Sequence, residues 1–232
     1  MKLQMRPHNT PGLLITFCGL DGCGKSTQIA MLEATLKKMD IFVSLTKQPT
    51  DFVRQSDIFR AYMDQPDHDA FDYRALSLLC ASDRVQHCNR VIRPRLATGD
   101  TIISDRYFYS CLANLKARGY MEDLWIYEIA ESIPKPDVAF FLDVPVETAV
   151  ARVRERPTER DRYIDMDLQY RLREEYILIA RKNSGIILNS EETPEQTHQH
   201  IIAAVNECLV AGNTGADRAT VPKTAARKMG AA

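Results

Sequence analysis

The stretch Gly19-Leu20-Asp21-Gly22-Cys23-Gly24-Lys25-Ser26-Thr27 decides the fold of this chain of 232 residues. It matches G-x-x-x-x-G-K-[ST], the pattern of phosphate-binding loops. The apolar run before it, residues 13–18, is typical of a buried strand. Residues 28–39, which follow it, carry apolar side chains at helical spacing. A strand, a glycine-rich loop and a helix in this order form a phosphate-binding unit.

Each part of the loop has an expected chemical task. The glycines let backbone N–H groups turn inward around phosphate oxygens, and the N-terminus of the next helix adds its positive dipole end. Lys25 is expected to reach the β- and γ-phosphates of a nucleotide, and the Ser26 hydroxyl to ligate Mg²⁺. We therefore expect Gly19, Leu20, Asp21, Gly22, Cys23, Gly24, Lys25, Ser26 and Thr27 to form the cofactor-binding site.

Composition narrows the class of protein. The length suits one α/β domain with a tail. The formal net charge of −1 argues against nucleic-acid and membrane-surface partners. We expect no transmembrane span and no secretory signal, because the apolar runs are too short. The six cysteines form no C-x-x-C pair, which is typical of reduced thiols in a cytoplasmic protein.

Five short apolar runs predict strands, at residues 13–18, 41–46, 101–104, 138–142 and 185–188. Helical patterns separate them, so we expect a three-layer α/β fold, with a five-stranded parallel sheet between helices. One domain is expected over residues 1–210, and a disordered tail over residues 211–232. The expected helices cover residues 28–39, 52–63, 71–93, 109–118, 121–132, 168–180 and 195–210, with another beginning at residue 146. A polar loop is expected at residues 64–69, and Pro94 is expected to interrupt the long third helix.

Asp105 and Arg106 directly follow the third predicted strand. Ligands of open α/β sheets bind at the carboxyl ends of the strands, so both residues should lie near the phosphate-binding loop. Asp105 is expected to hold Mg²⁺ or a water bound to it, the alternative being a helix cap. Arg106 is expected to bind the phosphate of an acceptor, the alternative being a structural ion pair.

An arginine-dense segment, at about residues 152–166, is predicted to be a mobile lid. Pro157 breaks it, and Arg154, Arg160 and Arg162 are its candidate catalytic residues. A solvated charged face is the alternative, because Glu155, Glu159 and Asp161 are interleaved with the arginines.

The chain resembles thymidylate kinases, a family of P-loop nucleoside monophosphate kinases, over residues 13–210. The resemblance implies a homodimer that uses ATP and Mg²⁺ to convert a nucleoside monophosphate to its diphosphate. Arg106 would bind the phosphate of the acceptor and Arg84 its base. Because the loop carries no basic residue between Gly19 and Lys25, lid arginines would supply the catalytic charge. The segments that carry the resemblance are residues 19–28, 81–84 (Ala-Ser-Asp-Arg), 105–107 (Asp-Arg-Tyr), 136–137, 142–144 and 161–163.

The chain departs from the family around the nucleobase. Cys18 replaces the usual Glu, and Cys80 replaces the aromatic residue that stacks on thymine. Cys111 replaces a small hydrogen-bonding residue, and Asn114 a tyrosine beside the sugar. The acceptor is therefore expected to be thymidine monophosphate or a related, unusual nucleotide. The expected substrate-binding residues are Asp21, Cys80, Arg84, Arg106, Cys111 and Asn114.

Three other functions have weaker support. A GTPase switch would carry an N-K-x-D guanine motif, which this sequence lacks. A deoxynucleoside kinase needs a general base for its hydroxyl acceptor, and has Glu-Arg-Ser where this chain has Asp105-Arg106-Tyr107. A pathway-specific kinase for another small phosphorylated metabolite is favoured only by the altered pocket.

Overall fold

The five expected strands form one sheet in the computed structural model, which describes residues 1–64 and 72–214. All pairings are parallel and the order is β2-β3-β1-β4-β5, which confirms the predicted fold class. Each strand begins and ends within two residues of its expected bounds. The strands are β1 (Leu13–Cys18), β2 (Val43–Lys47), β3 (Thr101–Asp105), β4 (Val138–Asp143) and β5 (Ile186–Asn189).

The central strand, β1, is buried along its whole length, whereas the edge strands β2 and β5 are partly exposed. A parallel sheet covered on both faces requires such continuous apolar runs at its centre. In the register of the sheet, Phe17 lies opposite Asp105, and Cys18 lies opposite Phe141. The carboxyl ends of β1, β3 and β4 therefore lie side by side, and the residues after them meet at one edge.

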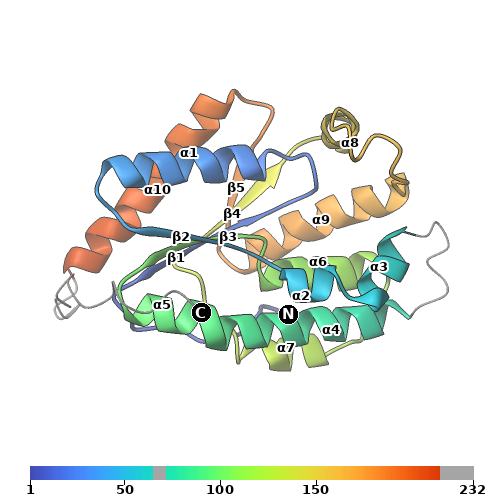
Figure 1. Cartoon of the computed structure of the whole chain (residues 1–232), viewed down its shortest axis with the longest axis horizontal. Coiled ribbons are helices and arrows are strands. Elements are labelled where there is room, and N and C mark those ends of the chain that lie inside the picture. Colours follow the sequence, from blue (N-terminus) through green and yellow to red (C-terminus); the bar gives the residue numbers. More distant parts are fainter. Residues whose placement is uncertain (65–71, 215–232) are drawn as a thin grey trace.

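Helices cover both faces of the sheet. Figure 1 shows α1 and α10 on one side of it, and α4, α5 and α7 on the other. The helix α9 packs against α6 and β4. The helical segments of the described residues are α1 (Lys25–Lys38), α2 (Asp51–Arg54), α3 (Asp57–Asp64), α4 (Tyr73–His87), a π-helical turn (Cys88–Ile92), α5 (Arg93–Ala97), α6 (Phe108–Ala117), α7 (Trp125–Ala130), α8 (Val146–Arg154), α9 (Met166–Lys182) and α10 (Pro194–Thr214).

The prediction that Pro94 interrupts the long helix is wrong. The helix α4 passes into the π-helical turn and then into α5, so the helical path continues to Ala97. Pro94 lies in the first turn of α5, where its missing N–H deprives the helix of little. The wider π-helical turn directly before it supplies the local adjustment that a proline ring demands.

The helix expected over residues 52–63 is divided into α2 and α3. Ser56 lies between the two, and its hydroxyl donates to the carbonyl of Val53 at 2.7 Å while it accepts from the N–H of Phe59 at 3.3 Å. A serine side chain competes with the helical backbone in this way. It ends one helix and begins the next.

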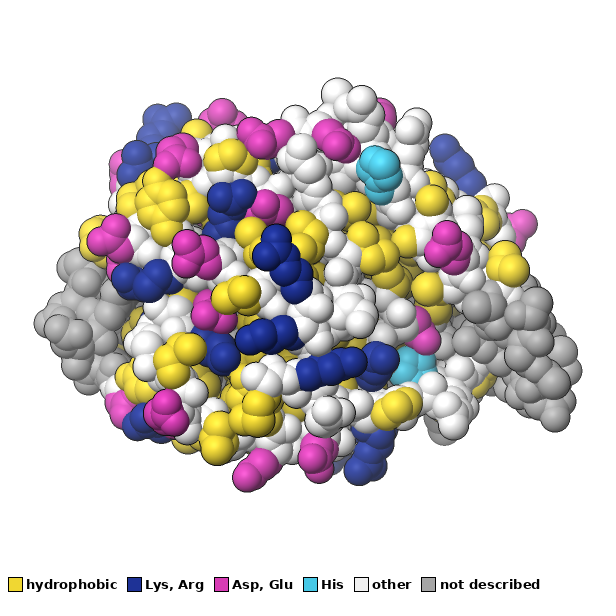
Figure 2. Space-filling view, turned by 180° about the vertical axis from the view of Figure 1, so that it is seen from behind, with side chains coloured by type: hydrophobic (Ala, Val, Ile, Leu, Met, Phe, Trp, Pro, Cys, Tyr) yellow, Lys and Arg dark blue, Asp and Glu magenta, His cyan; other side chains and the backbone are white. Residues whose placement is uncertain are grey.

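The last helix, α10, reaches Thr214 and so passes the domain boundary expected at residue 210. The rest of the expected tail, and the expected polar loop apart from Asp64, lie outside the described residues. No helix in the described ranges has both the length and the apolar character needed to span a membrane. On the face opposite that of Figure 1, basic side chains form a row with acidic side chains on both sides, so neither charge dominates that face (Figure 2).

We expect Phe140→Ala to lower the free energy of unfolding by about 3–5 kcal/mol. Phe140 is fully buried in β4, and its ring lies 5.2 Å from that of Phe17, so truncation leaves a cavity between two central strands. Urea titration monitored by circular dichroism measures the change. Phe42→Ala is the control, because Phe42 is 71% exposed, and should change stability by less than about 0.5 kcal/mol. Equal losses in the two variants would contradict this account of the core.

Candidate active site

The phosphate-binding loop has a left-handed backbone conformation at Gly22 and Gly24. Gly22 and Gly24 have φ angles of 83° and 95°, in the left-handed region that L-residues rarely adopt. A Cβ atom on Gly22 would also collide with the carbonyl group of Ala149 in α8. The loop therefore turns tightly into the N-terminus of α1, where unpaired N–H groups favour an anion.

The first turn of α1 carries Lys25, Ser26 and Thr27. The Lys25 side chain is buried, and its ammonium group donates to the carbonyl oxygens of Leu20 at 2.7 Å and Gly19 at 3.2 Å. These bonds hold the positive charge within the loop. Ser26 and Thr27 are exposed and line the cleft described below. The loop thus combines a cation, two hydroxyl groups and a helix N-terminus, which together suit polyphosphate.

Arg106 lies beside this loop, at the end of β3. Its backbone N–H donates to the carbonyl of Phe17 at 2.8 Å, and its own φ angle is 66°. Its guanidinium group pairs with the carboxylate of Asp21 at 2.5 Å, and Arg162 approaches the same carboxylate at 3.6 Å. The charges of Arg106, Lys25 and Arg162 hold the pKa of Asp21 well below its usual range. Asp21 therefore stays ionised and binds two arginines of the site.

Asp105 has one oxygen engaged and one without a partner. Its Oδ2 lies 3.7 Å from the ammonium of Lys47, whereas its buried Oδ1 has no hydrogen-bond partner among residues 1–64 and 72–214. Asp105 and Ser26 line the same cleft. A carboxylate oxygen and a hydroxyl oxygen match the ligand preference of Mg²⁺, so these residues fit the metal that the sequence motif implies.

Cys80, Arg84, Cys111 and Asn114 lie together on the other side of the cleft, on α4 and α6. Arg84 is 3% exposed and donates to the carbonyl of Cys80 at 2.8 Å, and its Nε has no partner within the described part of the chain. Cys111 contacts Ser77 through its sulfur, at 3.8 Å. Burial raises the pKa of Cys80 to about 11, so its thiol is neutral. The wall thus offers a buried guanidinium beside two small side chains.

The amide of Asn114 is already engaged at both ends. Its nitrogen donates to the carbonyl of Ser110 at 2.9 Å, and its oxygen accepts from Arg118 at 2.9 Å. Arg118 lies over the ring of Tyr73, 3.9 Å from its centre, and also donates to the hydroxyl of Tyr62 at 2.8 Å. Asn114 therefore shapes the cleft through its small size more than through free hydrogen-bonding groups. The i, i+4 spacing of Asn114 and Arg118 was the only sequence signal for this cluster.

The arginine-dense segment contributes to the site unevenly. Its first residues belong to α8, and α9 begins at Met166, so the irregular part spans residues 155–165. Arg162 reaches Asp21, and Arg152 donates to the carbonyl of Ser190 at 3.2 Å. Arg154 and Arg160 are exposed and do not line the cleft, whereas Arg156, which was not a candidate, does. The structure therefore brings one of the three candidate lid arginines into the site.

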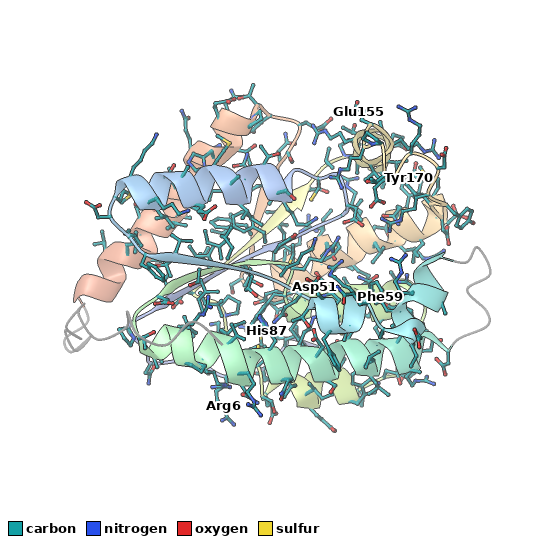
Figure 3. The ribbon with its side chains drawn as sticks, viewed as in Figure 1. Arg6, Asp51, Phe59, His87, Glu155 and Tyr170 are labelled. Atoms are coloured by element: carbon teal, nitrogen blue, oxygen red, sulfur yellow. The ribbon has the colours of Figure 1, made fainter. Side chains whose placement is uncertain are left out.

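A single cleft of about 1160 Å³ joins these groups. It extends from the start of α10, where Pro194 accepts a hydrogen bond from Gln28 at 2.8 Å, past the loop to Tyr62 and Tyr73. Figure 3 shows its surroundings at the end of the molecule where α1 begins, with Phe59 on one side and Glu155 and Tyr170 on the other. Two phosphate-bearing molecules could therefore meet between the loop and Arg106.

Comparison with known proteins agrees with this geometry. The family model described as "Thymidylate kinase" matches residues 17–201. The chain belongs to the thymidylate kinase family. It is 34% identical to a probable thymidylate kinase of Thermococcus gammatolerans over 209 residues, which cover 87% of this chain and 99% of the relative. It is 32% identical to a thymidylate kinase of Halothermothrix orenii over 210 residues, 86% and 99% of the two chains. The protein is therefore a kinase that transfers phosphoryl groups to nucleoside monophosphates.

Cys18, the residue at which the sequence is expected to depart from the family, lies at the carboxyl end of β1. Cys18 is fully buried at the end of β1, and burial raises the pKa of its thiol to about 11. The hydroxyl of Ser110 donates to its sulfur at 4.0 Å. A neutral thiol therefore occupies the position where the resemblance leads one to expect Glu, and Asp21 balances the charge of Arg106.

Lys25→Met should weaken the binding of a nucleoside triphosphate by about ten- to a hundredfold, because it removes a charge-assisted hydrogen bond to phosphate. Calorimetric titration measures the affinity. Lys37→Met is the matched control, because Lys37 lies on the same helix but is exposed and pairs with Glu33 at 2.7 Å. Similar affinities for Lys25→Met and the wild type would contradict the assignment of the loop.

Proposed function

We propose that this kinase uses ATP and Mg²⁺ and acts on a nucleoside monophosphate whose ring is not held by the usual aromatic stack. One observation carries the proposal: the loop around Lys25 faces Arg106, Arg84 and Cys80 within a single cleft. Donor phosphates would bind at the loop, and the acceptor would bind between α4 and α6. The phosphates of the donor and of the acceptor would meet within this cleft.

Ser26 and Asp105 would hold the metal ion. The unpartnered Oδ1 of Asp105 supports this assignment, since a buried carboxylate oxygen is costly without a ligand or a hydrogen bond. When bound, the ion would neutralise charge on the phosphate oxygens. Lys25 and the loop N–H groups would orient the donor, and Arg162 would add positive charge at the transferred group.

The acceptor half of the cleft has a surplus of positive charge, which favours an anionic acceptor. Arg54, Arg84 and Arg118 form no salt bridge with a carboxylate of the described residues, and donate instead to carbonyl, amide or hydroxyl oxygens. Arg106 would bind the phosphate of the acceptor. That phosphate is already ionised, so its attack needs no general base, unlike the hydroxyl acceptor of a deoxynucleoside kinase.

Two further proposals follow from the resemblance to the family. We propose a homodimer, and a cytoplasmic location, which the free, buried thiols of Cys18, Cys80 and Cys111 support. A kinase for another small phosphorylated metabolite is the second candidate function, because Cys80 and Cys111 place small side chains in the wall of the acceptor half of the cleft. An acceptor screen with ATP and Mg²⁺ across nucleoside monophosphates and phosphorylated sugars distinguishes the two.

Arg162→Ala should lower kcat on the order of a hundredfold while changing ATP affinity much less, because its charge would act chiefly on the transition state. Steady-state kinetics and ATP titration separate the two effects. Arg160→Ala, two residues away and outside the cleft, should keep kcat within about twofold of the wild type. Equal kcat values for all three proteins would show that the segment is a solvated face.

Cys80→Phe should raise kcat/KM for thymidine monophosphate by about ten- to a hundredfold, the usual effect of a base–aromatic stack. It should lower kcat/KM for the native acceptor, which fills the space beside Cys80. Leu78→Phe is the control, because Leu78 lies on the same helix, is 44% exposed and lies outside the cleft. If the wild-type enzyme already prefers thymidine monophosphate over every other acceptor, the altered specificity is disproved.

A further inference from the structure

The hydroxyl group of Tyr176 lies between Arg106 and the helix α6. It accepts a hydrogen bond from the guanidinium of Arg106 at 2.9 Å, and donates one to the hydroxyl of Ser110 at 3.1 Å. We propose that Tyr176 is a positioning residue for the acceptor phosphate, which holds one edge of the Arg106 guanidinium so that the other edge meets the ligand. This inference rests on the proposed role of Arg106.

The contacts of Arg106 differ in how easily they can move. Its Nη2 pairs with Asp21, whose side chain is 45% exposed at the cleft. Its Nη1 donates to Tyr176, which is 4% exposed, and to the carbonyl of Gly19 at 3.3 Å. An incoming phosphate competes with the carboxylate of Asp21 for the same positive charge. The buried phenol keeps the guanidinium in place while that exchange occurs.

The surroundings of Tyr176 fix its hydroxyl group. Its ring lies 6.5 Å from that of Phe141 in β4, and burial raises the pKa of the phenol, so the hydroxyl keeps its proton. A protonated phenol can donate one hydrogen bond and accept another. Ser110 accepts the hydrogen bond of the phenol and Arg106 donates to its lone pair, so both functions are used.

Tyr176 also connects Arg106 to the helix that follows the proposed lid. Asp165 caps the N-terminus of α9 through a hydrogen bond from the N–H of Leu168 at 2.9 Å. Three residues before Tyr176, Arg173 binds Asp143 at the end of β4 with bonds of 2.6 and 2.8 Å. The bonds of Arg173 and Tyr176, which lie one helical turn apart, hold α9 to the carboxyl edge of the sheet. Residues 155–165 therefore lead into α9, and the part of α9 around Tyr176 is bonded to Arg106, the proposed acceptor arginine.

Tyr176→Phe tests the proposal, because it removes the hydroxyl and keeps the buried ring. We expect KM for the nucleoside monophosphate to rise about tenfold or more, the usual effect of losing a hydrogen bond to a charged group. KM for ATP should stay within about twofold. Tyr170→Phe is the matched control, since Tyr170, labelled in Figure 3, lies on the same helix and bonds to Glu147 on the surface. It should leave both KM values unchanged.

A double-mutant cycle with Ser110→Ala distinguishes positioning from loss of packing. If the two hydroxyls act as one unit, the double variant should have the same KM for the acceptor as Tyr176→Phe alone. Additive effects, an unchanged acceptor KM, or equal increases in both KM values with a lower melting temperature would overturn the proposal.

A binding measurement separates this inference from the proposed function. Calorimetric titration with inorganic phosphate, with the loop occupied by a non-hydrolysable ATP analogue, reports on Arg106 without any turnover, and Tyr176→Phe should weaken that binding about tenfold. If the wild-type protein transfers no phosphoryl group to any nucleoside monophosphate but shows this difference, the proposed function fails and the positioning role stands. If phosphate binds equally to both proteins, the positioning role fails whatever the acceptor.

Discussion

The pairing of β1 with β3 is the constraint on which the site depends. Phe17 lies opposite Asp105, and the N–H of Arg106 donates to the carbonyl of Phe17. The phosphate-binding loop begins directly after Cys18 at the end of β1, and Arg106 directly follows the neighbouring strand β3. The residues proposed to bind the donor and the acceptor therefore start at the same edge of the sheet. A slip of the register of β3 by one residue would move each of its side chains, including that of Asp105, to the other face of the sheet. Burial of every β1 residue opposes such a slip.

Much of the fold could be predicted from the sequence because its signals are local. The apolar runs located the strands, and the glycines, Lys25 and Ser26 located the loop. Pro94 misled the prediction because its effect depends on the π-helical turn before it, a feature without a sequence signature. The break at Ser56 likewise depends on one hydroxyl bonding to two backbone groups.

The site was less predictable because several of its properties are relations between distant residues. Spacing alone does not distinguish Arg162, which reaches Asp21, from Arg154 and Arg160, which face away. Tyr176 appears in the sequence as one more apolar position of α9. Its hydroxyl gains a role only because α9 packs beside α6 and the end of β3.

The carboxylate of Asp21 has a thermodynamic consequence for ligand binding. It already neutralises part of the charge of Arg106 and Arg162, so two cations remain close together without strong mutual repulsion. A phosphate that enters replaces one anion with another. Its observed binding free energy would therefore be a difference between two ion-pair energies, and smaller than that of the phosphate pair alone. Such an exchange allows tight contact in the complex together with rapid release of product.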